Sequence, residues 1–148
     1  MKFDPARIQS FTVQDPPAWL QVGDHEAYLG YIADEDEGSA MGLAFIRFRK
    51  GVSFEFRWAY HEVCIVTRGS LTVRVGEDAM TARRGDFLHM PAGVAGVFDV
   101  REDFEAVCVH HPTDGRASRE WAGAELLPAD ASIRPVDIGD VWPERDPA

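Results

Sequence analysis

The 148-residue sequence contains little cysteine and no long hydrophobic run. Its two cysteines, Cys64 and Cys108, lie far apart within apolar stretches, a pattern that excludes a disulfide framework and a Cys-x-x-Cys motif. Two buried free thiols are typical of a reducing compartment. No apolar stretch reaches the roughly 18–20 residues that a membrane span needs, and the first residues lack the apolar segment of a signal peptide. We therefore expect a cytoplasmic protein with no membrane partner.

Positive charge is scarce too. The chain carries 15 Lys and Arg against 25 Asp and Glu, which gives a formal net charge of −10. Because an acidic surface repels nucleic-acid phosphates, we expect no nucleic-acid partner. The hydrophobic share of 45% and the charged share of 27% are those of an ordinary globular protein, and the length fits one domain.

Long amphipathic helical patterns are also missing. The middle of the chain instead holds short segments rich in Val, Phe and Ile, separated by Gly, Asp or Arg-Gly. Many short apolar segments at close spacing predict an all-β sandwich or barrel. Leu71, Val73 and Val75 alternate with polar residues, which is the pattern of a half-buried strand. The predicted strands cover residues 41–48, 52–58, 62–67, 71–75, 86–90, 96–100 and 104–110.

The two ends of the chain lack this strand pattern. Residues 1–24 contain two consecutive prolines and predict an extended arm that lies on the surface or on a partner subunit. Residues 117–127 predict one short helix. We divide the single domain into an N-terminal arm with edge strands (1–40), a barrel (41–112) and a C-terminal extension that packs on the barrel (113–148).

Two stretches of the barrel segment carry a family resemblance. The first runs from Glu62 to Gly69, a Glu followed by a Gly after six intervening residues. The second runs from Gly85 to Gly93, a Gly-Asp strand that ends in Pro-x-Gly. In this order and about fifteen residues apart, they resemble the two conserved motifs of the cupin superfamily. The resemblance implies a small double-stranded β-helix, or jelly-roll, barrel over residues 41–112.

The same resemblance bears on metal binding. Metal-binding cupins place His-x-His before that Glu and another His after the Pro-x-Gly. Matched position by position, the first two histidines fall on Glu55 and Arg57, the Glu is kept as Glu62, and the last histidine falls on Gly96. Two carboxylates make a poor transition-metal site, and a guanidinium does not ligate. The resemblance therefore implies no metal of the usual kind, and we expect no cofactor.

The closer resemblance is to the metal-poor cupins of the ethanolamine-utilisation Q type. The run that begins at Met41, the Tyr60-His-Glu62 sequence and the strand that ends at Pro112 are similar to that branch. Those proteins carry a proposed acetate kinase activity. Because this chain has no phosphate-cradling Gly loop and its net charge opposes a nucleotide, we carry over the fold rather than that activity.

The register of residues 54–58 decides which side chains line the barrel, since a slip of one residue exchanges the two faces of a strand. The motif match favours Glu55 and Arg57 facing inward. In the alternative register Phe54, Phe56 and Trp58 face inward and fill most of the cavity.

The favoured register gives a charged site. Glu62 is the predicted catalytic base, and Glu55 and His89 are further acid–base candidates. Arg57 is predicted to clamp an anionic substrate, with a structural Glu–Arg pair as the alternative. The other predicted substrate-binding residues are Tyr60, Trp58 and Cys64.

We therefore expect a small-molecule-binding cupin that acts as a metal-independent acid–base enzyme, of the isomerase, dehydratase or lyase type, on a small polar or anionic substrate. One alternative is a non-catalytic binding or scaffold cupin of an ethanolamine-utilisation-like pathway. Another is a metal-dependent cupin that uses His89 with His110 or His111. A homodimer is expected from the N-terminal arm and from the family resemblance.

Overall fold

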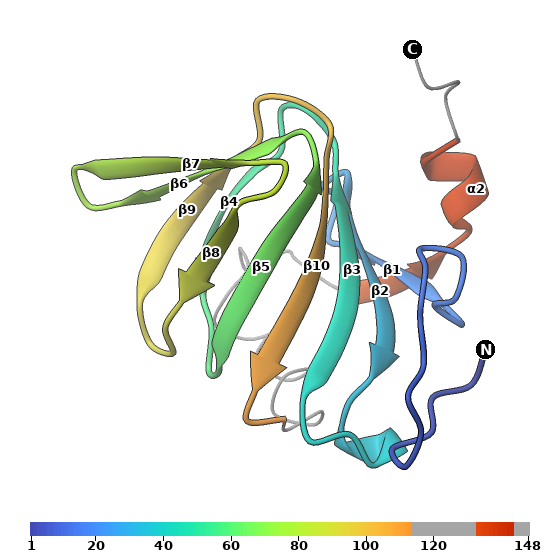
Figure 1. Ribbon diagram of the computed structural model, residues 1–148. Coiled ribbons are helices and arrows are strands. Elements are labelled where there is room, and N and C mark those ends of the chain that lie inside the picture. The colour runs from blue at the N-terminus through green and yellow to red at the C-terminus, as the bar shows by residue number, and fades with distance from the viewer. Residues whose placement is uncertain (114–132, 144–148) are drawn as a thin grey trace.

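Two antiparallel β-sheets face each other in the computed structural model, which describes residues 1–113 and 133–143 (Figure 1). The larger sheet has the order β11 (Ile133–Val136), β1 (Trp19–Val22), β2 (Ala27–Ala33), β3 (Gly42–Phe48), β10 (Phe104–His111), β5 (His61–Arg68) and β8 (Phe87–Met90). The smaller sheet has the order β4 (Ser53–Arg57), β9 (Ala95–Asp99), β6 (Ser70–Val75) and β7 (Asp78–Arg83). This architecture confirms the predicted all-β jelly-roll class.

The helical content is small. Among the described residues it consists of the 3-10 turn η1 (Glu35–Glu37) and the one-turn helix α2 (Ile138–Val141). None of the helices in the described part of the chain has the length and hydrophobicity to cross a membrane. The helix predicted over residues 117–127 lies outside the described residues.

All seven predicted strands are present, and no end differs from the prediction by more than one residue. The strands β1 and β2 lie in the segment that was expected to hold edge strands, although no bounds were predicted for them, and the prediction missed β7 and β11. In β7 five of six residues are exposed, so the strand carries no apolar alternation. In β2 the central Gly30 weakens the strand pattern; there the Trp19 indole covers the backbone, and a Cβ would lie 2.8 Å from that ring.

The register of β4 is opposite to the favoured prediction. Phe54 and Phe56 are 5% and 4% exposed, whereas Glu55 and Arg57 are exposed on the outside. The ring of Phe56 stacks on that of Phe98 in β9, with centroids 4.1 Å apart. Burying each phenylalanine stabilises the fold by roughly 1.5–3 kcal/mol, whereas burying a Glu and an Arg would carry a large desolvation cost. The motif match was therefore wrong by one residue on this strand.

The Phe56 ring also explains Gly96. The two residues are cross-strand partners, and a Cβ at Gly96 would lie 2.8 Å from the Phe56 ring. The position that holds a histidine in metal-binding cupins is thus occupied by a phenyl ring from the neighbouring strand.

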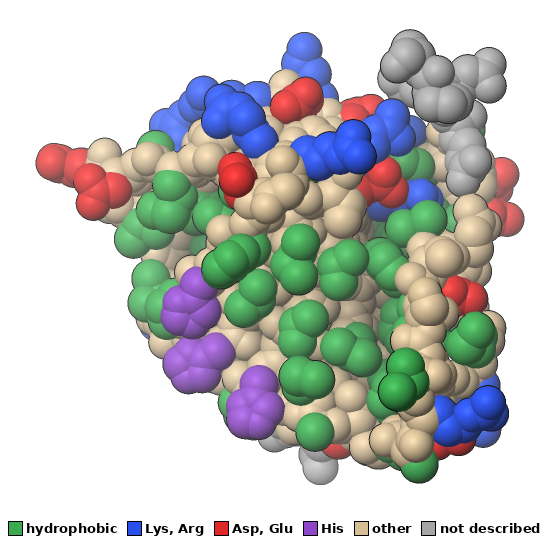
Figure 2. All heavy atoms as spheres, in the orientation of Figure 1, with side chains coloured by type: hydrophobic (Ala, Val, Ile, Leu, Met, Phe, Trp, Pro, Cys, Tyr) green, Lys and Arg blue, Asp and Glu red, His purple; other side chains and the backbone are tan. Residues whose placement is uncertain are grey.

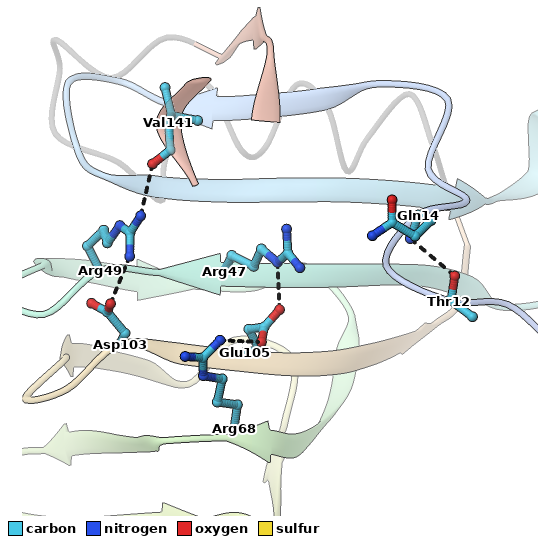
Figure 3. A network of polar contacts seen from close by, with 8 residues as sticks. All are labelled: Thr12, Gln14, Arg47, Arg49, Arg68, Asp103, Glu105 and Val141. Atoms are coloured by element: carbon cyan, nitrogen blue, oxygen red, sulfur yellow. Dashed lines mark hydrogen bonds and ion pairs between the residues drawn. The ribbon is translucent and has the colours of Figure 1, made fainter. Parts of the chain in front are cut away.

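Part of the outer face of the larger sheet is covered by the C-terminal segment. Arg49 donates one hydrogen bond to Asp103 and another to the carbonyl of Val141, and its guanidinium lies 3.9 Å from the Trp142 ring centroid (Figure 3). The neighbouring Arg47 is buried under the same Trp142 ring. These contacts hold α2 against the outer face.

The close fit of Gly96 against Phe56 predicts a strong coupling between the two positions. Gly96→Ala is expected to lower the free energy of unfolding by roughly 1–3 kcal/mol because the added methyl overpacks the ring. In a Phe56→Leu background the same change should cost less, because the leucine lacks the outer ring atoms. Urea denaturation of wild type, the two single variants and the double variant measures the coupling as a double-mutant cycle. Equal costs in both backgrounds would contradict the contact.

Candidate functional site

A small cavity lies in the barrel between the two sheets and has a volume of about 50 Å³. A water molecule needs roughly 10–15 Å³ by the same measure, so the cavity has room for only a few non-hydrogen atoms. Aromatic and aliphatic side chains form most of its wall. Its polar groups and thiols come from Tyr31, Trp58, Tyr60, Glu62, Cys64, Cys108 and His110.

Four of these groups come from two neighbouring strands. Glu62 and Cys64 face inward from β5, and Cys108 and His110 face inward from β10. Register makes Cys64 the partner of Cys108, and Glu62 the partner of His110. Directly opposite side chains on antiparallel strands have Cβ atoms about 4.5–5.5 Å apart. The four side chains therefore form a compact square on one wall of the cavity.

Glu62 is the central acid of this square. Its side chain is 7% exposed, and burial raises the pKa of its carboxyl to about 8. The Cys108 thiol donates a hydrogen bond to the carboxyl, which lowers the pKa by a smaller amount. Glu62 is therefore mostly protonated at neutral pH, and its carboxyl both donates and accepts hydrogen bonds.

The two cysteines are buried free thiols, as predicted. Their hydrogen bond to each other, followed by burial and by Glu62, raises the pKa of Cys108 well above its ordinary value. Because a thiolate rather than a thiol is the nucleophile, Cys108 is not a nucleophile near neutral pH.

His110 is held between two neighbours. Its ring stacks on Tyr60 with centroids 4.1 Å apart, and its other face lies on the backbone of Gly42, where a Cβ would overlap the imidazole. Burial lowers the pKa of His110, while the carboxylates of Asp34 and Glu35 act in the opposite direction. The buried imidazole is therefore held in its neutral form near neutral pH.

Two buried nitrogens retain unused hydrogen-bonding capacity. Among the described residues, Nε2 of His110 and Nε1 of Trp58 have no hydrogen-bond partner, and both residues line the cavity. Buried polar groups in proteins are nearly always paired, so each such atom requires an explanation. A molecule in the cavity with a hydrogen-bond acceptor would satisfy the Trp58 N–H.

The structure brings together four of the predicted site residues: Trp58, Tyr60, Glu62 and Cys64 all line the cavity. The expectation that Glu55, Arg57 and His89 also line it is wrong. Glu55 and Arg57 lie on the outer face of β4, and His89 is exposed on β8 because Leu88 and Met90 take its inward positions. The predicted anion clamp is therefore absent from the cavity wall.

The neighbours His110 and His111 lie on opposite faces of β10, where His110 is buried and His111 is exposed. Sequence reasoning did not identify His110 as a cavity residue. A usable signal was present, because Ala106, Cys108 and His110 share one face of the strand and the first two are small apolar residues.

The usual metal of the superfamily does not fit this cavity. The inward positions of β4 carry Phe54 and Phe56, and the Phe56 ring fills the space beside Gly96. His89 and His110 point to opposite sides of the larger sheet and cannot share an ion. Throughout residues 1–113 and 133–143, no three His, Cys, Asp or Glu side chains are grouped so that they could hold a metal ion.

Comparison with known proteins confirms the cupin resemblance. Residues 46–106 match the family described as the EutQ-like cupin domain. A putative ethanolamine utilization protein Q from Salmonella typhimurium is 26% identical over 60% of this chain and 71% of that chain, with a TM-score of 0.57. The EutQ protein of Clostridium difficile is 20% identical over 60% of this chain and 69% of that chain, with a TM-score of 0.56.

The fold is shared more widely than that branch. Ectoine synthase from P. lautus is 15% identical over 78% of this chain and 81% of that chain, with a TM-score of 0.59. At this identity the likeness concerns the fold alone. No curated protein matches the chain.

The raised pKa of Glu62 predicts a pH-dependent stability. Between pH 4.5 and about 8 the unfolded chain loses this proton while the folded chain keeps it, so the free energy of unfolding falls as the pH rises. The loss is roughly 3–5 kcal/mol. Glu62→Gln should remove it, so that the variant becomes more stable relative to wild type from pH 4.5 to 8. Urea titrations across this range measure the difference, with Glu55→Gln as the exposed control. A difference that is constant with pH would contradict the raised pKa.

The burial of His110 predicts an imidazole that resists protonation. Its midpoint in an NMR titration should lie below 6.5, its ordinary value, and His110→Gln assigns the signal by removing it. A midpoint at or above 6.5 would show that the carboxylates of Asp34 and Glu35 outweigh burial.

Proposed function

Because residues 46–106 match the EutQ-like cupin domain, we propose that this barrel binds a small uncharged polar molecule and that Glu62 exchanges a proton with it. The observation that supports the proposal most is one cavity that holds both a buried carboxyl with a pKa of about 8 and two unpartnered nitrogens. Strongly perturbed titratable groups in a cavity are typical of functional sites.

The wall of the cavity constrains the ligand. No Lys or Arg occurs among the described residues that line it, so an anion would have no compensating charge there. The Trp58 N–H requires an acceptor, and the protonated Glu62 can serve a carbonyl or hydroxyl oxygen. These features favour a neutral carbonyl or hydroxy compound of a few non-hydrogen atoms.

The proposed chemistry is acid–base catalysis by Glu62. A pKa close to neutrality makes both the acid and the base form accessible, which is the best compromise for proton transfer. In a dehydration, Glu62 would give its proton to the departing hydroxyl, water would leave, and the carboxylate would take a proton from the neighbouring carbon. An isomerisation or a lyase-type step would use the same two transfers. The Cys108 thiol would stabilise the carboxylate form through its hydrogen bond.

A second candidate is a non-catalytic binding or scaffold role, such as one in an ethanolamine-utilisation-like pathway. Phe54, Phe56 and Phe98 fill much of the barrel and leave a cavity of only about 50 Å³, which favours this alternative. The two candidates differ in whether Glu62 is needed for turnover or only for binding.

The proposal also includes a cytoplasmic location and a homodimer. The two buried free thiols support a reducing compartment. The homodimer has support from the exposed apolar side chains of Ile65 and Phe87 on the larger sheet.

A panel of small neutral aldehydes, ketones and hydroxy compounds, followed by NMR at the Trp58 Nε1–H, tests the binding proposal. We expect at least one compound to shift this signal, and for a compound that reacts, Glu62→Gln should lower turnover by about 100-fold or more. Glu55→Gln, on the outside of the barrel, should leave turnover unchanged.

Two results would contradict the proposal in different ways. If no compound shifts the Trp58 signal, the cavity does not bind this class. If Glu62→Gln turns a compound over at the wild-type rate, Glu62 is not the acid–base group.

A further inference from the structure

The hairpin formed by β6 and β7 extends beyond the edge of the larger sheet (Figure 1). Its inward face carries Leu71, Val73 and Ala82, which are buried in the core between the two sheets. Register places Met80 opposite Val73 on this same face, yet Met80 is 45% exposed. Figure 2 shows hydrophobic side chains gathered below the hairpin. Within the described residues, the facing sheet therefore leaves the end of the hairpin uncovered.

An open space fills this gap. The larger sheet ends at β8, a strand of only four residues, and a pocket of about 250 Å³ lies between β8 and the hairpin. We call it the outer pocket. Its apolar wall includes the side chains of Phe56, Val73, Val75, Met80, Leu88 and Met90.

The wall of the outer pocket favours a hydrocarbon. Among the described side chains that line it, only Asp78 and His89 are polar, and both are exposed and can stay hydrated at the rim. An aliphatic group placed against the remaining wall loses contact with water and leaves no charge desolvated. A second polar or anionic group would find few partners there.

Only one layer of side chains separates the outer pocket from the cavity that holds Glu62. Met90 lines both spaces. Beside it, the Phe56 ring lines the outer pocket, and its centroid lies 5.6 Å from that of Trp58, which lines the cavity. Methionine has three rotatable bonds and adapts its shape readily. Movement of the Met90 side chain can therefore join the two spaces.

We infer that the ligand of this barrel is a neutral amphiphile whose carbonyl or hydroxyl end lies in the cavity and whose unbranched aliphatic tail passes Met90 into the outer pocket. The unpartnered Trp58 N–H binds the polar end, and Met80 contacts the tail. Each space alone is smaller than the roughly 300 Å³ at which small-molecule sites begin, and the two joined reach that size. Met90 is then the residue that selects for a flexible, unbranched chain.

This inference rests on the proposed function and names its ligand class, because the small polar molecule of that proposal becomes one end of a longer one. Binding of the polar end is read at the Trp58 Nε1–H, and binding of the tail is read at the Met80 methyl group. The two proposals can therefore fail separately.

A series of linear methyl ketones from butanone to nonan-2-one, titrated into the full chain and followed by NMR at both signals, tests the inference. Affinity should rise by about 4-fold for each added CH₂ that enters the outer pocket. Every ketone should shift the Trp58 signal, and the longer ones should also shift the Met80 methyl signal.

Two variants decide whether the gain comes from this pocket, since any apolar surface favours a longer tail. Met80→Ser should lower the ratio of nonan-2-one to butanone affinity by about 5-fold or more, because it removes apolar contacts to the tail. Met90→Ile keeps the bulk but is stiff at χ1, so it should hold the passage closed and lower the same ratio by a similar factor. The matched control is Met41→Ser, at a methionine of equal exposure outside both spaces, which should change the ratio by less than about 2-fold.

The outcomes separate the two proposals. If butanone shifts the Trp58 signal and nonan-2-one binds no more tightly, the inference is overturned and the proposed function stands. If no ketone shifts the Trp58 signal, the proposed binding is contradicted and the inference falls with it, even where a long ketone shifts Met80 alone.

The inference is also overturned if a folded Met80→Ser or Met90→Ile keeps the wild-type affinity ratio, or if Met41→Ser lowers it equally. Should Met90→Ile fail to fold by circular dichroism, the comparison of Met80→Ser with Met41→Ser decides, because both positions are exposed. A Met80 signal that shifts with protein concentration in the absence of ketone would show that a second copy fills the outer pocket, which likewise overturns the inference.

Discussion

The stacking of Phe56 on Phe98 is the contact on which the rest of the site depends. It fixes the register of β4, and that register sends Glu55 and Arg57 to the outside of the barrel. The Phe56 ring fills the space beside Gly96, so the histidine that metal-binding cupins carry there has no room. With Arg57 on the outside and no room for the usual metal, Glu62 has no Lys, Arg or metal ion beside it among the described residues that line the cavity. Its high pKa is therefore a consequence of aromatic packing on the opposite sheet.

Much of the fold was predictable from the sequence, because strand periodicity and the turn glycines are local properties. The seven strands of the central segment and the inward position of Glu62 followed from such patterns and from the two motifs. The register of residues 54–58 did not follow from local patterns. The alternation of Phe54, Glu55, Phe56 and Arg57 allows either the aromatic or the charged side chains to face inward. Only the partners across the barrel decide it, and desolvation of Glu and Arg outweighs the family pattern.

The pairing of β5 with β10 explains why the site was found only in part. Glu62 and Cys64 were recognised within a motif, whereas His110 and Cys108 lie outside the motifs and enter the site through cross-strand register. Register between strands more than 40 residues apart is a tertiary property that no local pattern of one sequence reveals. The exposed position of His89 follows from the same source, since register makes it the partner of Val63, which lies on the face of β5 opposite to Glu62 and Cys64.

The asymmetry of the cavity has a stereochemical consequence. The ring of His110 is fixed between Gly42 and Tyr60, and Glu62 extends from the same wall of the barrel. The facing wall, formed by Phe54 and Phe98, has no group that can exchange a proton. If Glu62 protonates a prochiral molecule in this space, as proposed, the proton would arrive from one side only, which would make the product a single enantiomer.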